Sequence, residues 1–115
     1  MAKRDQSLDY LLHLHGQILF LDEKGAHWVK FVVRRVPVSE ARPHGLDYSL
    51  TLHDAAGERL VGFDNAHKVK GSKDKQRDHR HIHKTVKPYD YQDAGTLVED
   101  FWKTVDKILK ERGVK

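Results

Sequence analysis

The stretch DAGTLVEDFWKTVDKILKERG, residues 93–113, decides the fold of this chain. Asp93 is placed to cap the start of a helix, and Gly113 follows its last turn. The apolar residues between them recur at helical spacing and form one stripe, which consists of Leu97, Val98, Phe101, Trp102, Val105, Ile108 and Leu109. Because such a stripe is normally buried, the stretch predicts a C-terminal helix packed on one face of a sheet.

The residues before this helix predict an antiparallel meander. Alternating apolar and polar residues, or short apolar runs, mark four strands, at 17–21, 27–36, 48–52 and 59–64. Lys30 and Arg34 would lie on the face of the sheet opposite to Phe31. Residues 7–15 predict a short N-terminal helix. We therefore expect an α+β fold with a four-stranded, mainly antiparallel sheet, in a single domain that spans residues 1–115.

Composition excludes several classes of protein. The chain of 115 residues contains no cysteine, so it has neither a disulfide framework nor a thiolate zinc site, which suits a reducing cytoplasm. Its first residues are polar and charged, and no apolar run approaches the ~20 residues that span a bilayer. We expect a cytoplasmic protein with no membrane contact.

The positive charge of the chain is concentrated in one basic loop, residues 66–87. This loop holds eight of the 21 Lys and Arg residues and two acidic residues, whereas the remainder of the chain is slightly acidic. Such a local field attracts polyanions through counterion release, so we expect His67, Lys68 and Lys70 to bind RNA. A solvated loop that only keeps the protein soluble is the alternative.

The basic loop contains the cluster His79, Arg80 and His81, followed by His83. If these residues are extended, the histidines share one face and Arg80 takes the other. The histidines then offer a base and an acid to a ribose 2′-OH and its phosphate, with Arg80 or a lysine of the loop stabilising the charged intermediate. If they are helical, His79 and His83 pair at four-residue spacing and suit a metal ion. We favour the metal-independent site without a cofactor, and the role of His83 stays open.

Residues on either side of the basic loop complete the candidate site. Asp64 would orient a catalytic histidine, and Asn65 would hold a phosphate, although both residue types also serve in turns. Tyr89 and Tyr91 would stack on a base or donate to a phosphate, unless they are structural. Lys30 and Arg34 add positive charge on the open side of the sheet.

The chain resembles the TumE-like toxins of bacterial toxin–antitoxin pairs in several separate motifs that follow one another from His27 to Leu109. These motifs are His27-Trp28-Val29-Lys30-Phe31, Arg42-Pro43-His44-Gly45, Tyr48-Ser49-Leu50, Gly62-Phe63-Asp64-Asn65-Ala66-His67, Asp78-His79-Arg80-His81, Pro88-Tyr89-Asp90-Tyr91, Asp93-Ala94-Gly95 and Asp100-Phe101-Trp102. The resemblance implies a small helix-turn-helix antitoxin as the cognate partner, and analogy with RelE-like toxins implies RNA cleavage.

The sequence therefore predicts a toxin that acts as a metal-independent endoribonuclease. Its catalytic residues would be His79, Arg80, His81 and Asp64, and its partners RNA and the antitoxin. The alternative is a non-catalytic module that binds nucleic acid or regulates through the same basic surface. The oligomeric state is left open between a homodimer and a toxin–antitoxin hetero-oligomer.

Overall fold

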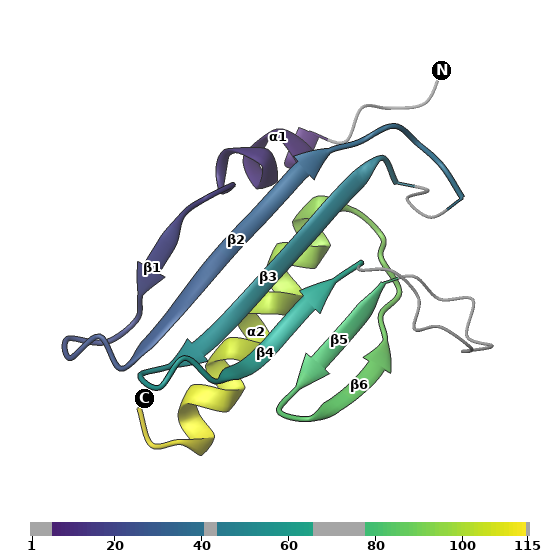
Figure 1. Ribbon diagram of the computed structural model, residues 1–115. Helices are drawn as coiled ribbons and strands as arrows, with labels where there is room; N and C mark the ends of the chain where they lie inside the picture. Colours follow the sequence, from purple (N-terminus) through teal and green to yellow (C-terminus); the bar gives the residue numbers. More distant parts are fainter. Residues whose placement is uncertain (1–5, 41–43, 66–77, 115) are drawn as a thin grey trace.

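A computed structural model describes residues 6–40, 44–65 and 78–114 of the chain (Figure 1). It contains one antiparallel sheet whose six strands follow one another in chain order. The elements are α1 (Gln6–His13), β1 (Ile18–Phe20), β2 (His27–Arg35), β3 (Leu46–Asp54), β4 (Arg59–Asp64), β5 (His79–Ile82), β6 (Thr85–Pro88) and α2 (Ala94–Glu111). The predicted α+β meander and C-terminal helix are confirmed.

The prediction of four strands is wrong, because β5 and β6 add a hairpin at one edge of the sheet. Residues 79–87 belong to the predicted basic loop, and residues 66–77 of that loop lie outside the described residues. The hairpin escapes sequence reading because charged and polar residues alternate with each other there, without the apolar period that reveals a half-buried strand. Its turn places His83 in the left-handed region, at a φ of 53°.

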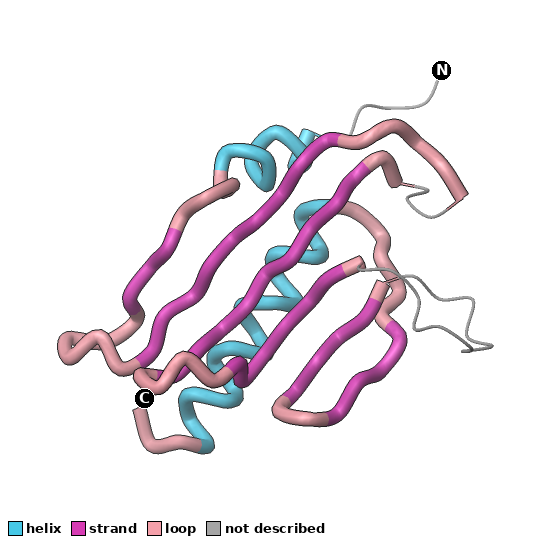
Figure 2. The backbone as a smooth tube through the Cα atoms, viewed as in Figure 1, coloured by secondary structure: helices cyan, strands magenta, loops and turns pink. Residues whose placement is uncertain are grey.

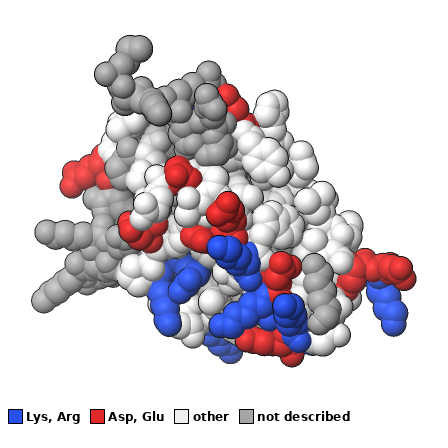
Figure 3. All heavy atoms as spheres, turned by 180° about the vertical axis from the view of Figure 1, so that it is seen from behind, with Lys and Arg blue, Asp and Glu red and all other residues white. Residues whose placement is uncertain are grey.

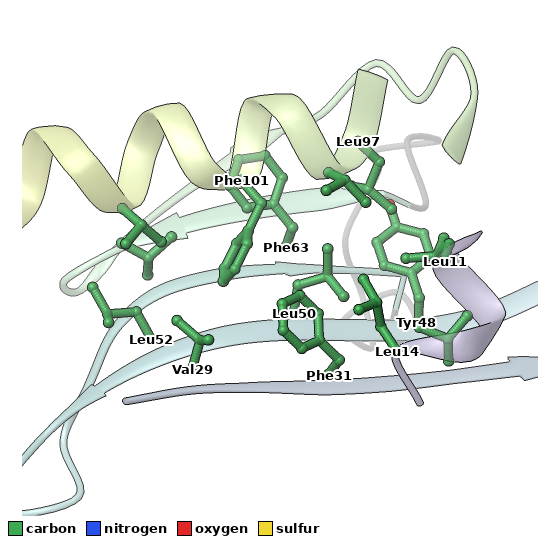
Figure 4. Close-up of a cluster of buried hydrophobic side chains, with 14 of the residues drawn as sticks. Leu11, Leu14, Val29, Phe31, Tyr48, Leu50, Leu52, Phe63, Leu97 and Phe101 are labelled. Atoms are coloured by element: carbon green, nitrogen blue, oxygen red, sulfur yellow. The ribbon is translucent and has the colours of Figure 1, made fainter. Parts of the chain in front are cut away.

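Both helices cover the same face of the sheet, and the other face is open (Figure 2). The core lies between the two layers (Figure 4). Phe101 of α2 is fully buried, with its ring centroid 5.7 Å from that of Phe31 and 6.0 Å from that of Phe63. Leu11 and Leu14 of the N-terminal segment close the end of the same core.

The ends of α2 carry the predicted caps. The Asp93 carboxylate accepts a hydrogen bond from the backbone N–H of Thr96 at 2.7 Å. Gly113 follows the helix with a φ of 75°, a conformation that costs glycine little. The length and direction of α2 are therefore set by local sequence as well as by its apolar stripe.

Candidate functional site

The face of the sheet that the helices leave uncovered, here called the open face, carries several of the polar residues that the sequence predicted for the site. Side chains that face each other across a ladder lie on one side of a sheet, so the register defines this face. Two rows cross it, one formed by Lys30, Thr51, Gly62 and His81 and the other by Val32, Ser49, Asp64 and His79. The open face therefore brings Asp64, His79 and His81 together.

His81 lies between two charged partners. Its Nε2 is 3.0 Å from Asp64 Oδ2, and its Nδ1 is 3.3 Å from Nη2 of Arg59. A guanidinium can only donate and a carboxylate accepts, so the arrangement fits the neutral tautomer with the proton on Nε2. The side chains of His81 and Asp64 are 15% and 12% exposed, which leaves this Asp64–His81–Arg59 chain reachable at the surface of the sheet.

The environment of His81 favours its neutral form. Partial burial is the main cause that lowers the pKa of His81, and the positive charges of Arg59 and His79 lower it further. The Asp64 carboxylate opposes this shift without overcoming it. His81 is therefore unprotonated at neutral pH and able to accept a proton, which is what a general base needs.

Arg59 reaches His81 by lying over Gly62. A Cβ atom placed on Gly62 would lie 3.2 Å from Arg59 Cδ. The absence of a side chain at Gly62 therefore leaves the space that the aliphatic part of Arg59 occupies. Arg59 belongs to the open face only because the register shifts between Leu52 and His53, which pairs Arg59 with His53. In a regular strand, Arg59 would share the helix-covered face with Phe63.

Arg80 lies on the opposite side of β5 from the two histidines, so the structure does not form the predicted His79, Arg80 and His81 cluster. Arg80 faces Phe63, whose ring packs against Phe101 of α2. Its Nε is the one buried side-chain polar atom of the described residues without a hydrogen-bond partner. Alternation along a strand separates neighbours, and the cation that lies beside His81 is Arg59.

The remaining predicted residues of the open face are spread across it. The rings of His79 and His81 lie 6.4 Å apart. Lys30 and Arg34 are exposed, and Lys30 is three strands from His81, roughly 14 Å at the usual spacing between strands. Lys30 therefore lies too far away for direct contact with His81.

Asn65 and Tyr89 are buried and Tyr91 is partly buried, and all three contact other residues of the protein. The Asn65 side chain accepts from the N–H of Tyr48 at 3.0 Å and donates to the carbonyl of Leu46 at 2.6 Å. Tyr89 donates its hydroxyl to Asp100 at 2.7 Å and is 7% exposed. The ring of Tyr91 lies 4.1 Å from that of His44. His67, Lys68 and Lys70 lie outside the described residues.

Sequence reasoning missed a buried acid beside this region. Asp78 is 3% exposed and accepts a hydrogen bond from the Tyr48 hydroxyl at 2.5 Å, while its other oxygen is 3.5 Å from His44 Nε2. Burial and this hydrogen bond to Asp78 raise the pKa of Tyr48 well above its usual value, so its hydroxyl keeps its proton. The pair anchors the start of β5 to β3.

The geometry gives no support to the helical alternative for the histidines. Residues 79–82 are a strand, and His83 lies in the turn after it rather than one helical turn above His79. Within residues 6–40, 44–65 and 78–114, no group of three or more His, Cys, Asp or Glu residues is arranged to hold a metal ion.

The two charged neighbours of His81 should shift its pKa in opposite directions when they are replaced. Arg59→Gln should raise the pKa of His81, because a neighbouring cation is removed, and Asp64→Asn should lower it further, because a neighbouring anion is removed. Titration of the imidazole signals by NMR measures both shifts. Equal shifts in one direction would contradict the Asp64–His81–Arg59 chain.

The same pKa fixes how stability depends on pH. Because folding lowers the pKa of His81, its contribution to stability is complete above the unfolded value of about 6.5 and is lost as the pH falls through the folded value. Acidification therefore weakens the fold at this position, and a neutral His81→Gln variant should lack that part of the pH dependence.

A model of the family described as toxin TumE matches residues 6–109, which is most of the chain. No curated protein and no solved structure matches it. Among the described helices, none is both long enough and apolar enough to cross a membrane.

Proposed function

This chain belongs to the TumE toxin family, and from that membership we propose that it is the toxin of a toxin–antitoxin pair that cleaves RNA without a metal ion. The observation that carries the proposed chemistry is the Asp64–His81–Arg59 chain on the open face of the sheet. It supplies a neutral base, a carboxylate that orients the base, and a cation, which are the groups that cleavage by the ribose 2′-OH requires.

In the proposed reaction, the 2′ oxygen of the ribose attacks the adjacent phosphorus and displaces the 5′ oxygen of the next nucleotide. His81 Nδ1 takes the 2′-OH proton, while Asp64 holds Nε2–H and stabilises the imidazolium that forms. Arg59 leaves Nδ1 and binds the phosphate oxygens, where negative charge builds up in the transition state. The products are a 2′,3′-cyclic phosphate and a free 5′-hydroxyl.

His79 is the proposed acid. It lies on the same face as His81 with its ring 6.4 Å away, a separation that leaves room for a phosphate between the two imidazoles. In its protonated form it donates a proton to the leaving 5′ oxygen. Arg80 takes no part in this mechanism, because its side chain lies on the helix-covered face with Phe63.

RNA binding is proposed for the open face rather than for the side that carries α2. Figure 3 shows the basic residues of the α2 side gathered in its lower part among acidic residues, with acidic residues alone above them, so that side has no positive field of one sign. The open face carries exposed Lys30 and Arg34, with Asp47 across the ladder from Arg34. It also carries the Trp28 ring, stacked at 4.2 Å on His53, as an aromatic surface next to these cations.

The second candidate is a module that binds RNA without cleaving it. The observation in its favour is that both ring nitrogens of His81 already have partners, so the imidazole accepts a proton only after Arg59 moves. In either case, we propose that the cognate antitoxin is a small helix-turn-helix protein that acts in the cytoplasm by covering the open face.

The proposed function is tested by expression and by an RNA cleavage assay. The chain produced alone should stop growth, and co-production of the antitoxin should restore it. The purified chain should cut RNA in excess EDTA, leave cyclic phosphate ends and show a bell-shaped pH profile near neutrality. Unrestricted growth would contradict the toxin role. RNA that is bound tightly but not cut would favour the second candidate, a module that binds RNA without cleaving it.

A further inference from the structure

We infer that a second copy of this chain adds to the edge of the sheet at β1, in antiparallel register about a two-fold axis at Leu19. Strand β1 is the first strand of the sheet, and no described element lies beyond its outer edge (Figure 1). The unpaired backbone of an edge strand is a template for another strand. This inference concerns assembly and does not depend on the proposed reaction.

The backbone of β1 leaves hydrogen-bonding groups free at two residues. Leu21 donates to the carbonyl of His27, and Gln17 accepts from the N–H of Phe31. Residues along an antiparallel ladder alternate between bonded and non-bonded pairs, so Leu19 bonds to β2 while Ile18 and Phe20 turn their N–H and C=O groups outward. The outer edge therefore offers two donors and two acceptors.

The side chains of β1 are apolar and exposed. Ile18, Leu19 and Phe20 are 49%, 39% and 65% exposed, so all three expose apolar area to water. Tyr10 of α1 is 57% exposed as well. Natural edge strands are usually protected by charge or proline, and an apolar edge of this kind is typical of a strand that pairs.

The opposite edge has the protection that β1 lacks. Strand β6 contains Lys87 and ends at Pro88, which has no N–H to give to another strand. Val86 is its only exposed large apolar residue. The difference between the two edges points to β1 as the one at which another strand docks.

The sequence of β1 fits a second copy of itself. Centring the two-fold axis at Leu19 pairs Ile18 with Phe20 of the second copy and Phe20 with Ile18, which uses all three residues of the strand. These are the two residues whose backbone groups turn outward, so four hydrogen bonds form.

An axis of this kind stands perpendicular to the sheet. The two sheets join into one, and both open faces lie on the same side of it, with both pairs of helices on the other. Ile18 and Phe20 belong to the open face, because they pair with Lys30 and Trp28. The assembly therefore joins the two candidate sites through a continuous surface.

The register is tested with single cysteines, because the chain contains none of its own. In the proposed dimer, position 19 faces itself in a non-bonded antiparallel pair, in which the Cα atoms are about 4.5 Å apart and can form a disulfide. Leu19→Cys of the full chain should therefore cross-link readily with oxidised glutathione. Ile18→Cys alone should cross-link about tenfold more slowly or less, because disulfide geometry fails at the longer distance.

Two further measurements complete the test. In an equal mixture of Ile18→Cys and Phe20→Cys, about half of the dimers bring the two cysteines opposite each other, and these should cross-link. Val86→Cys on β6 should not cross-link. The unmodified chain should be a dimer by light scattering, Leu19→Glu and Leu19→Lys should each be monomers, and their mixture should be a dimer again. An unmodified chain that stays monomeric at high concentration, or equal rates for all cysteine variants, would overturn the inference. A β1 edge that pairs with the antitoxin and never with a second copy of the chain would also overturn it.

Discussion

Replacing His81 by alanine should lower the rate of RNA cleavage by about 10²- to 10⁴-fold and leave RNA affinity nearly unchanged. The neutral imidazole is the proposed base, and its loss leaves Asp64 and Arg59 without the group that joins them. Because groups that act as a unit are not additive, the double variant with His79→Ala should lose less than the product of the two single losses. Single-turnover cleavage and equilibrium binding of the same RNA measure the two quantities separately.

The matched control is His83→Asn. His83 lies in the β5–β6 turn with a φ of 53°, and asparagine tolerates this left-handed conformation. Its cleavage rate should equal that of the unchanged chain. The acid side of the pH profile should fall below pH 6.5, because the pKa of His81 is lowered and only its neutral form accepts a proton. Full activity in His81→Ala would exclude His81 as the base.

Replacing Phe101 by alanine should lower the free energy of unfolding by about 3–5 kcal/mol. The ring is fully buried between α2 and the sheet, and its removal leaves a cavity against Phe31 and Phe63. Total stability of a domain is about 5–15 kcal/mol, so this loss amounts to between about a fifth and all of it. Urea denaturation followed by circular dichroism measures the change.

Lys103→Ala is the control for this measurement. Lys103 lies in the same part of α2 but is exposed, and a surface substitution of this kind should change stability by no more than about 0.5 kcal/mol. A small loss in Phe101→Ala would mean that α2 does not hold the sheet.

The layers of the fold could be predicted from sequence because each rests on a periodic signal. The apolar stripe of α2 and the alternation in β2 each predict one element and the face that it buries. The β5–β6 hairpin lacks that signal, because its four β5 residues are all only partly buried. Its place in the sheet depends on pairing with β4, which no local pattern announces.

The candidate site was predictable in part for the same reason. Alternation along an extended segment puts His79 and His81 on one face, and turn residues at a strand end point to Asp64. Arg59 was missed because the register shift in the β3–β4 ladder moves it to the open face, whereas simple alternation along β4 places it on the helix-covered face. Arg80 was grouped with the histidines by sequence proximity, although alternation already placed it on the other face.

The order of the strands also has a consequence for how the protein folds. Each strand pairs with its neighbour in the chain, and the longest connection between paired strands, residues 65–78, joins β4 to β5. Longer connections cost more entropy to close, so β5 is expected to join the sheet after the strands that short turns connect. The Asp64–His81–Arg59 chain spans this last junction. A partly folded chain with β1 to β4 already paired would therefore still be without its site.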